Sequence, residues 1–422
     1  MTIRIRTKKI KELLFCMFIY ATIIVDVFRI ANNAFFHLGE SASTVFRNVV
    51  YIFIFVLMII CIREDKNSIK RFLILSAAYV TVVLISFIIN QDLGILIKNS
   101  VLIFFSRIAP AYIIASSMSD FKGAIERVIR WKWVVLIYIL VFLSVGISNT
   151  RYYYMNVGYN LLFPTLILLF SKGEKPILAK GIGVVSSVVI LLFCARGTTL
   201  VLIPSVLLFL VIKTFEMKNK KKRFAIIGTM LIVGILLIIN LDSIFELLYN
   251  QFPNSRTLYY IMHGDIMDSS GRNNFYSAGI TELMNNPFTI RGILGDRFYF
   301  GKCFSLADFE GAFAHNVILE VMLQFGVLIG FVISFLFLKH VGQAFYYGLK
   351  MRKDDVNIMI CAIIIPSFLI CLTTASYLSS IETLFMIGIC SSIISQKKRI
   401  ATRSSYEKNT HVGRLCSTDN CN

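Results

Sequence analysis

Long apolar runs dominate this chain and restrict what it can fold into. A helix of roughly 20 residues crosses the hydrocarbon core of a bilayer, and runs of about that length recur throughout the sequence. They do not alternate between apolar and polar residues, as the strands of a membrane barrel would. We therefore expect an all-α, polytopic membrane protein with about twelve transmembrane helices. The expected spans are 13–33, 46–62, 71–90, 99–118, 132–149, 155–171, 178–195, 197–215, 224–249, 314–338, 356–373 and 375–395.

The composition agrees with a membrane protein and excludes soluble classes. Hydrophobic residues make up 57% of the chain and charged residues 16%, against roughly 45–50% and 25% in soluble domains. The sequence has no low-complexity tract and no repeat of roughly 20–50 residues. It is therefore not expected to be collagen-like, disordered or a solenoid.

The positive charge lies in short segments between the runs. The net charge of +19 would suggest nucleic acid in a soluble protein, but 32 of the 43 basic residues fall in alternate connections and the two ends. Lys and Arg accumulate in cytoplasmic loops, so we expect both termini in the cytoplasm, attraction to anionic membrane lipids and no nucleic-acid partner. The first run lacks a small-residue cleavage site, which predicts an uncleaved anchor. The segments assigned to the cytoplasm are 1–12, 62–71, 119–132, 171–180, 213–223, 339–355 and the tail from 395.

One connection is much longer than the others. Residues 250–313 contain twelve aromatic residues and lie on the side that the charges assign to the outside. A loop of this length is usually functional or disordered, and the aromatic content argues against disorder. We expect it to form short amphipathic helices on the membrane surface. The predicted organisation is membrane helices over 1–249, an external loop over 250–313, membrane helices over 314–395 and a cytoplasmic tail over 396–422.

The sequence offers no spacing typical of a metal site. The five histidines are scattered, and no Cys or His pair stands at the interval of metal ligands. Of the nine cysteines, Cys303 alone falls in the external loop, so an external intrachain disulfide is not expected. We predict no metal and no cofactor.

Arg272 follows a helix-capping pattern in the external loop. Ser269 or Ser270 can cap a helix, and Pro287 ends the amphipathic stretch that follows. Arg272 then lies in the first turn, where free backbone N–H groups favour an anion. It is either part of a phosphate or pyrophosphate site or a surface arginine on an interfacial helix.

Arg196 lies in a short external turn between two apolar runs, followed by Gly197, Thr198 and Thr199. An arginine at this depth is either an interface anchor or a cation presented to a headgroup. The residues that follow can supply further hydrogen-bond donors to an anion.

The external loop ends in His315 and Asn316, with Glu320 one helical turn deeper. A neutral imidazole at the outer rim can act as a base near neutral pH. Glu320 shares a helix face with Asn316, and a carboxylate inside the membrane needs a partner or a cavity. The alternative is a rim histidine above a buried hydrogen-bonded pair. Gly326 and Gly330 follow, with a spacing that favours close helix packing.

Arg107 lies within an apolar run and has no acidic residue nearby in the sequence. It either lines a cavity for an anionic ligand or pairs with Glu320 or Glu382. The sequence does not choose between these possibilities.

Taken in order, these features resemble the O-antigen polymerase and O-antigen ligase family of bacterial envelope polysaccharide assembly. The resemblance covers roughly residues 150–335 and departs from the family pattern at Phe275, where a tryptophan is frequent, and in a lengthened segment over 291–295. It rests on the number of helices, the Ala195-Arg196-Gly197 turn, and a late external loop with Ser270-Gly271-Arg272, Asn286-Pro287, Gly292, Gly295 and Ala314-His315-Asn316, followed by Gly326 and Gly330.

The resemblance implies a GT-C-like helical glycosyltransferase in the bacterial cytoplasmic (inner) membrane. Its expected reaction is metal-independent polymerisation of lipid-linked oligosaccharide repeat units for capsule, O-antigen or exopolysaccharide. A sugar hydroxyl displaces undecaprenyl pyrophosphate on the outer face, with inversion. By this resemblance Arg196 and Arg272 bind the pyrophosphate, His315 is the base and Asn316 positions the reacting group. Undecaprenyl-pyrophosphate-linked glycans are the implied substrates, with a chain-length regulator and a flippase as possible protein partners.

Two other functions fit the same chain. An O-antigen ligase of the same family transfers the finished glycan to a lipid A core, and a lipid-linked oligosaccharide flippase moves it across the membrane. Transporters usually contain internal repeats, whereas here only one half of the chain holds a 64-residue external loop. This asymmetry favours an enzyme, and we prefer a polymerase to a ligase because some bacteria lack a lipid A core.

Overall fold

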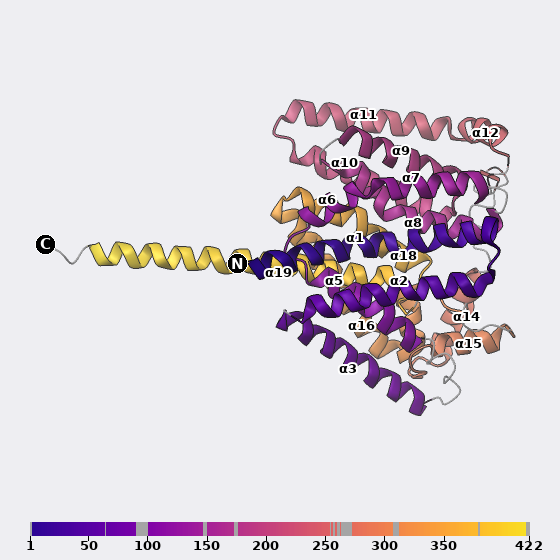
Figure 1. Ribbon diagram of the computed structural model, residues 1–422, viewed down its shortest axis with the longest axis horizontal. Coiled ribbons are helices and arrows are strands. Elements are labelled where there is room, and N and C mark those ends of the chain that lie inside the picture. Colours follow the sequence, from indigo (N-terminus) through magenta and orange to yellow (C-terminus); the bar gives the residue numbers. More distant parts are fainter. Residues whose placement is uncertain are drawn as a thin grey trace.

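The protein is an all-helical, multi-pass membrane protein. The computed structural model describes residues 2–63, 65–89, 100–146, 150–172, 176–253, 255, 258–259, 262, 272–306, 312–378 and 380–418. Every regular element within these residues is helical, and the long helices stand side by side in one bundle (Figure 1).

The first half of the bundle is built from the apolar runs up to residue 216. Large side chains such as Phe53, Leu84 and Val188 are exposed on its outside, as lipid-facing residues are. In the interior of the bundle Phe15 packs against Phe385 of the second half, with ring centroids 5.0 Å apart. The elements are α1 (Thr2–Ala31), η1 (Asn32–Phe36), α2 (Gly39–Ile62), α3 (Lys66–Ile89), η3 (Phe104–Ile108), α5 (Ala109–Ser116), α6 (Lys122–Arg130), α7 (Lys132–Val141), η4 (Phe142–Gly146), α8 (Thr150–Phe170), α9 (Pro176–Phe193) and α10 (Arg196–Glu216).

The second half adds one long helix over 220–239, short helices between 241 and 303, and the C-terminal membrane helices. The predicted hairpin of α9 and α10 is present, but it turns at residues 194–195, so Arg196 and Gly197 belong to α10 and not to the turn. The predicted end of the next-to-last membrane span is confirmed, because α18 ends at Thr373. The elements are α11 (Lys220–Ile239), α12 (Leu241–Gln251), α14 (Arg272–Asn285), α15 (Gly295–Cys303), α16 (Val317–Met351), α17 (Asp354–Met359), η7 (Ile360–Ile364), α18 (Ile365–Thr373) and α19 (Ile381–Thr418).

Fewer helices reach spanning length than the twelve predicted. Seven helices of the described chain are long and apolar enough to cross a membrane, or eight if the bent pair of α6 and α7 is one span. The predicted spans 99–118 and 155–171 lie on shorter apolar helices, Ser100–Ser116 and Met155–Phe170. Each apolar run therefore identified a helix, and α8 (Thr150–Phe170) begins five residues before the predicted span.

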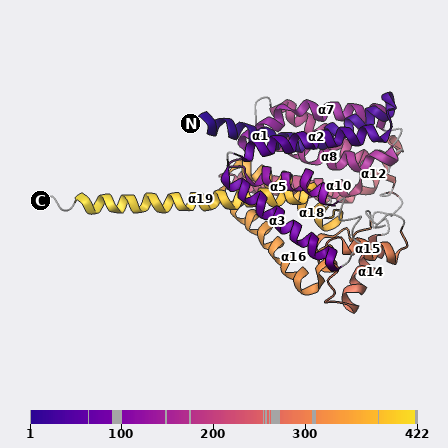
Figure 2. The same cartoon turned by 60° about the horizontal axis from the view of Figure 1, so that its bottom comes forward.

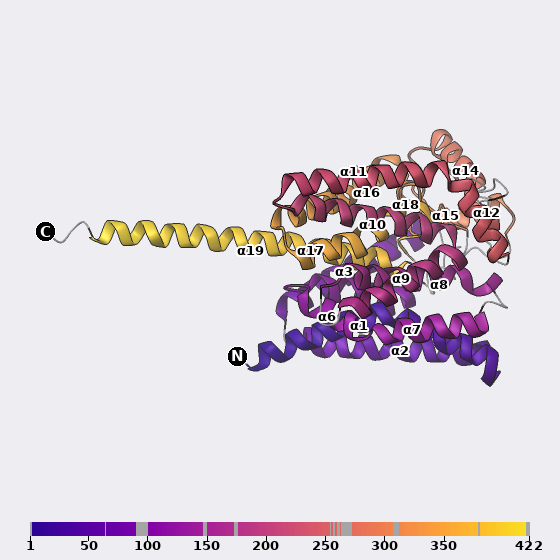
Figure 3. The same ribbon diagram turned by 90° about the horizontal axis from the view of Figure 1, so that it is seen from above.

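Both ends of the chain lie at the same end of the bundle (Figure 3). Ion pairs there join segments that the charge pattern assigned to one side: Lys8 to Asp120 at 2.8 Å, Lys11 to Asp65 at 2.7 Å and Lys172 to Asp354 at 2.8 Å. The predicted tail from 396 continues α19 as a helix to Thr418 and extends away from the bundle (Figure 1).

Helices α14 and α15, from the loop predicted to be external, lie at the opposite end of the bundle (Figure 2). Helix α14 begins at Arg272 and ends at Asn285, two residues before Pro287, as the capping pattern predicted. Ser269 and Ser270, the predicted caps, lie outside the described residues.

Helix α16 contains a break at Gly326, where φ is 75° and ψ is 165°. The segment over 287–292 bonds the backbone groups that the break frees: Val327 N donates to Pro287 O at 2.7 Å, and Gln324 O accepts from Arg291 N and Gly292 N. A methyl group at Gly330 would lie 2.6 Å from Met322 Cα, so the first part of α16 folds back on the second. The two glycines thus have different roles: Gly330 allows this close approach within α16, and Gly326 supplies the backbone conformation of the break.

Candidate functional site

Three of the residues singled out in the sequence meet at the C-terminal end of α18. Arg272 Nη1 donates to Thr373 O at 3.0 Å, and His315 Nδ1 lies 3.2 Å from Thr374 O. Asn316 Nδ2 donates to Leu372 O at 3.0 Å. The last carbonyls of a helix lack partners within it, so these side chains satisfy consecutive backbone acceptors. Arg272 precedes His315 by 43 positions and Asn316 by 44 in the sequence. The three side chains are nevertheless held around one helix end.

Local backbone geometry holds His315 and Asn316 in place. Asn316 is the N-cap of α16, and its side chain accepts from Ile318 N and Leu319 N. His315 has a φ of 52°, in the left-handed region, which costs a non-glycine residue about 1–2 kcal/mol. Its ring packs on Phe313, with centroids 4.1 Å apart. The cap and the ring contact together stabilise this conformation.

The hydrogen bond of His315 defines which ring nitrogen is free. A carbonyl oxygen only accepts, so Nδ1 carries the hydrogen in the contact with Thr374 O, and Nε2 keeps its lone pair. Burial lowers the pKa of His315 and nearby Arg272 lowers it further, whereas the bond to Thr374 raises it, and the net direction is downward. The imidazole is therefore neutral at pH 7 and can accept a proton on Nε2.

The start of α10 lies beside the same helix end. A methyl group at Gly197 would lie 2.8 Å from the Tyr159 hydroxyl and 3.6 Å from Thr374 Oγ1. Arg196 is the first residue of α10, although its side chain lies outside the described part of the structure. The backbone thus brings the position of Arg196 close to the segment that binds Arg272 and His315.

Directly below this helix end lies a buried polar network that sequence reasoning missed. Ser376 Oγ donates to Glu320 Oε1 at 2.5 Å and accepts from Arg297 Nη2 at 3.1 Å. Gln324 joins it through Asp296 Oδ1 at 2.6 Å, and Glu320 also accepts from Tyr377 N. Asp296, Glu320 and Gln324 are completely buried.

The charges of this network do not balance when every group is ionised. Two carboxyl groups face one guanidinium, Arg297, which is 7% exposed. Burial raises the pKa of Asp296, although Arg297 and Gln324 lower it in part. Asp296 Oδ2 and Arg297 Nε have no hydrogen-bond partner within the described chain. Of the two possibilities left open for Glu320, a cavity or a partner, the structure shows partners: Glu320 belongs to this network, which connects α15 and α16 to the segment after α18.

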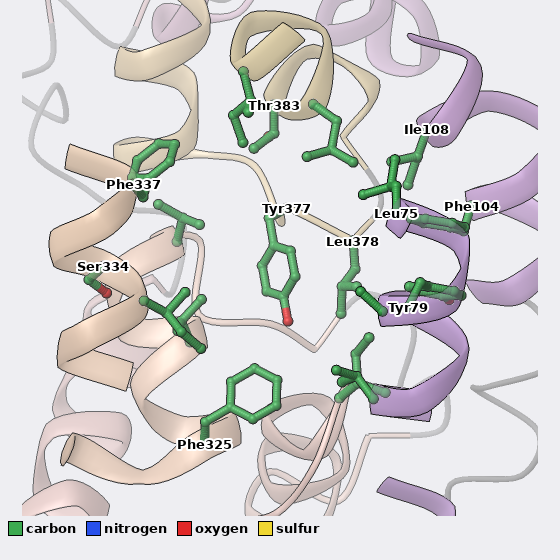
Figure 4. A pocket seen from close by; sticks show the side chains of 18 of the residues that line it. Leu75, Tyr79, Phe104, Ile108, Phe325, Ser334, Phe337, Tyr377, Leu378 and Thr383 are labelled. Atoms are coloured by element: carbon green, nitrogen blue, oxygen red, sulfur yellow. The ribbon is translucent and has the colours of Figure 1, made fainter. Parts of the chain in front are cut away.

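An apolar cavity of about 330 Å³ adjoins the network. Figure 4 shows Tyr377 between Phe325, Ser334 and Phe337 of α16 on one side and Leu75 and Tyr79 of α3 on the other. The Tyr377 hydroxyl donates to Gln324 Oε1, so one residue contacts both the polar network and the apolar lining. A cavity with this lining suits a hydrocarbon chain whose polar end lies at the outer rim.

Arg107 does not join the site in the way that the sequence suggested. Its guanidinium lies 4.7 Å from the centre of the Tyr51 ring, in a cation–π contact, and no ion pair to Glu320 or Glu382 is formed among the residues described. Glu382 Oε2 accepts from Ser380 Oγ instead. Of the two alternatives left open for Arg107, pairing with either acid is not found among the described residues, and Arg107 does not line the apolar cavity.

Comparison with known proteins assigns no family. No family model matches the chain, and no curated protein is similar to it. Within the described residues, no group of three or more His, Cys, Asp or Glu side chains is placed to hold a metal ion. The functional argument therefore rests on the residues gathered around α18.

Proposed function

We propose that this protein polymerises lipid-linked oligosaccharide repeat units on the outer face of a bacterial cytoplasmic membrane. The observation that carries the proposal is the meeting of Arg272, His315 and Asn316 at the end of α18, next to the start of α10. The sequence predicts Arg272 as an anion ligand, His315 as a base and Asn316 as a positioning group.

The proposed reaction is a displacement at the anomeric carbon of the donor. The hydroxyl oxygen of the acceptor sugar bonds to this carbon while its proton passes to His315 Nε2. The bond from the carbon to the pyrophosphate oxygen breaks, and the pyrophosphate leaves with the electron pair. Guanidinium groups suit this leaving group because they bind phosphate oxygens in pairs, and Arg272 and Arg196 are assigned that role.

Two further observations support a lipid-linked substrate. The apolar cavity lined by α3, η3, α16 and α19 gives an isoprenoid chain a place within the bundle. Tyr377 connects this cavity to the segment that carries Thr373 and Thr374. A donor whose tail enters the cavity would place its pyrophosphate near the rim, where the arginines are.

The experiment that tests the proposal uses the purified full-length protein in liposomes with undecaprenyl-pyrophosphate-linked repeat units. Polymerase activity yields lipid-linked glycans of two or more units together with free undecaprenyl pyrophosphate, and chelation with EDTA leaves the yield unchanged. A ligase would need an added lipid A core acceptor, and a flippase would move the substrate without lengthening it. A product formed only with the lipid A core acceptor, or movement of the substrate without lengthening, would contradict the proposed polymerase activity.

A further inference from the structure

A polar cavity of about 670 Å³ lies at the other end of the bundle from the candidate site. It is lined from four parts of the chain: the start of α1, the connection between α2 and α3, the end of α5 with the residues after it, and α19 near Arg399. Each of these parts includes residues that the charge pattern assigns to the cytoplasm. The volume is in the range of small-molecule sites, and the lining is too polar for a hydrocarbon chain.

The acidic side chains in this cavity are already paired. Asp120 binds Lys8 at 2.8 Å, and Asp65 binds Lys11 at 2.7 Å. Glu12 accepts from Arg127 at 3.4 Å. Burial acts to raise the pKa of Asp65, but its bonds to Lys11 and Ser68 lower it to about 2. The carboxylate is therefore charged at neutral pH and keeps its lysine occupied.

Three cations in the lining have no carboxylate partner among the described residues: Lys66, Arg71 and Arg399. Arg71 donates one hydrogen bond to Ser116 O at 2.6 Å, and Arg399 donates one to Ser395 Oγ at 3.3 Å. Each guanidinium carries five N–H donors, so both retain capacity for a ligand. With five basic and three acidic side chains in the lining, the cavity has a net charge of +2.

We propose that this basic cavity binds a phosphate group, carried either by an anionic lipid of the inner leaflet or by a soluble phosphate compound. Arginine matches phosphate oxygens with paired N–H donors, and lysine adds a point charge. The charge pattern of the sequence predicts that this end of the bundle faces the cytoplasm, where the lipid surface is negatively charged. Helix α19 carries Arg399 and extends away from the bundle (Figure 1). A ligand bound to Arg399 would therefore also hold the part of α19 that lies at the edge of the bundle.

The test compares two full-length variants that lose the same charge. The first is K66Q/R71Q/R399Q in the cavity, and the second is K339Q/K350Q/K353Q, a control in another segment assigned to the cytoplasm. Lipid binding is measured by native mass spectrometry with phosphatidylglycerol against phosphatidylcholine, and soluble binding by equilibrium dialysis with labelled inorganic phosphate. We expect wild-type protein and the control to retain phosphatidylglycerol or phosphate at least tenfold better than the cavity variant.

The outcomes separate the two sources of phosphate and can overturn the proposal. Loss of phosphatidylglycerol alone identifies a lipid site, and loss of inorganic phosphate binding identifies a soluble ligand. Equal binding by the cavity variant and wild type, equal loss in both variants, or no binding by wild type would each overturn it. If the triple variant does not fold, the exposed Lys66→Gln single change is compared with Lys339→Gln, and a weakening confined to Lys66→Gln is expected.

Discussion

Arg272 and His315 are bound to neighbouring carbonyl groups at the end of α18, Arg272 to Thr373 O at 3.0 Å and His315 to Thr374 O at 3.2 Å. One residue opens α14 and the other precedes α16, so two segments distant in the sequence are joined through α18. The same backbone therefore fixes the distance between the proposed anion ligand and the proposed base.

Replacing Arg272 tests the anion site. Arg272→Ala should reduce polymer by at least about tenfold, because a hydrogen-bonded charge is removed from the leaving group. Arg272→Lys keeps the charge but loses the paired donors, so it should restore activity only in part. Polymer length is measured on gels at matched expression, with the exposed cation Lys302 changed to Ala as a control. Wild-type polymer from Arg272→Ala would show that the anion site is misassigned.

The pH dependence of activity tests the protonation state of His315. Burial and Arg272 lower the pKa of this imidazole below its usual 6.5, and only the neutral form accepts a proton. Activity should therefore persist as the pH falls to 6.5 and decline only at lower pH. The rate is measured in liposomes between pH 5 and pH 8, with His340→Gln as a histidine control that keeps the same profile. A midpoint at or above pH 6.5 would contradict this assignment.

The break in α16 makes a prediction about stability. At Gly326, φ of 75° and ψ of 165° belong to a region that is nearly restricted to glycine, and other residues there cost about 1–3 kcal/mol. A methyl group would also lie 3.2 Å from Pro287 O. Gly326→Ala should lower the unfolding temperature in detergent. Gly342→Ala is the matched control on the same helix, since a methyl group there meets no atom within 4 Å. Equal unfolding temperatures for Gly326→Ala and the wild-type protein would contradict the proposed requirement for glycine at the break.

Helix ends were predicted correctly where the sequence signal acts over a few neighbouring residues. The start of α14 at Arg272 and its end before Pro287 follow from capping and proline patterns, which act over a few residues. The end of α18 follows from the interruption of an apolar run. The break at Gly326 was not predicted, because a glycine four residues before another is also typical of helix packing.

The buried polar network below the site could not be predicted from the sequence, because its members are far apart in the chain. Arg297 and Ser376 are 79 positions apart, and Gln324 and Asp296 are 28 apart. None of these residues stands out locally, since a pair such as Asp296 and Arg297 is common on protein surfaces. Only the fold shows that they are buried together. By contrast, Arg272, His315 and Asn316 were recognisable because each lies at a helix start next to an apolar segment.

The orientation of the bundle can be tested with Cys303. This thiol is free and exposed on α15, and the charge pattern places it outside. A membrane-impermeant maleimide should label Cys303 in intact cells or spheroplasts and should not label Cys416 or Cys421 of the predicted cytoplasmic tail. A Cys303→Ser variant gives the background. Labelling of the tail cysteines in place of Cys303 would reverse the orientation and move the candidate site to the cytoplasm.

The measurement that tests the central claim most directly is the fate of lipid-linked repeat units in a His315→Ala strain. Positioned proton transfer contributes about 10²–10⁴-fold to a rate. We therefore expect chain growth to stop while single repeat units accumulate in the outer leaflet, where an added glycosidase can reach them. The variant protein should be present at the wild-type level. Normal polymer in this strain would contradict the role of His315, and single units confined to the inner leaflet would contradict the proposed polymerase.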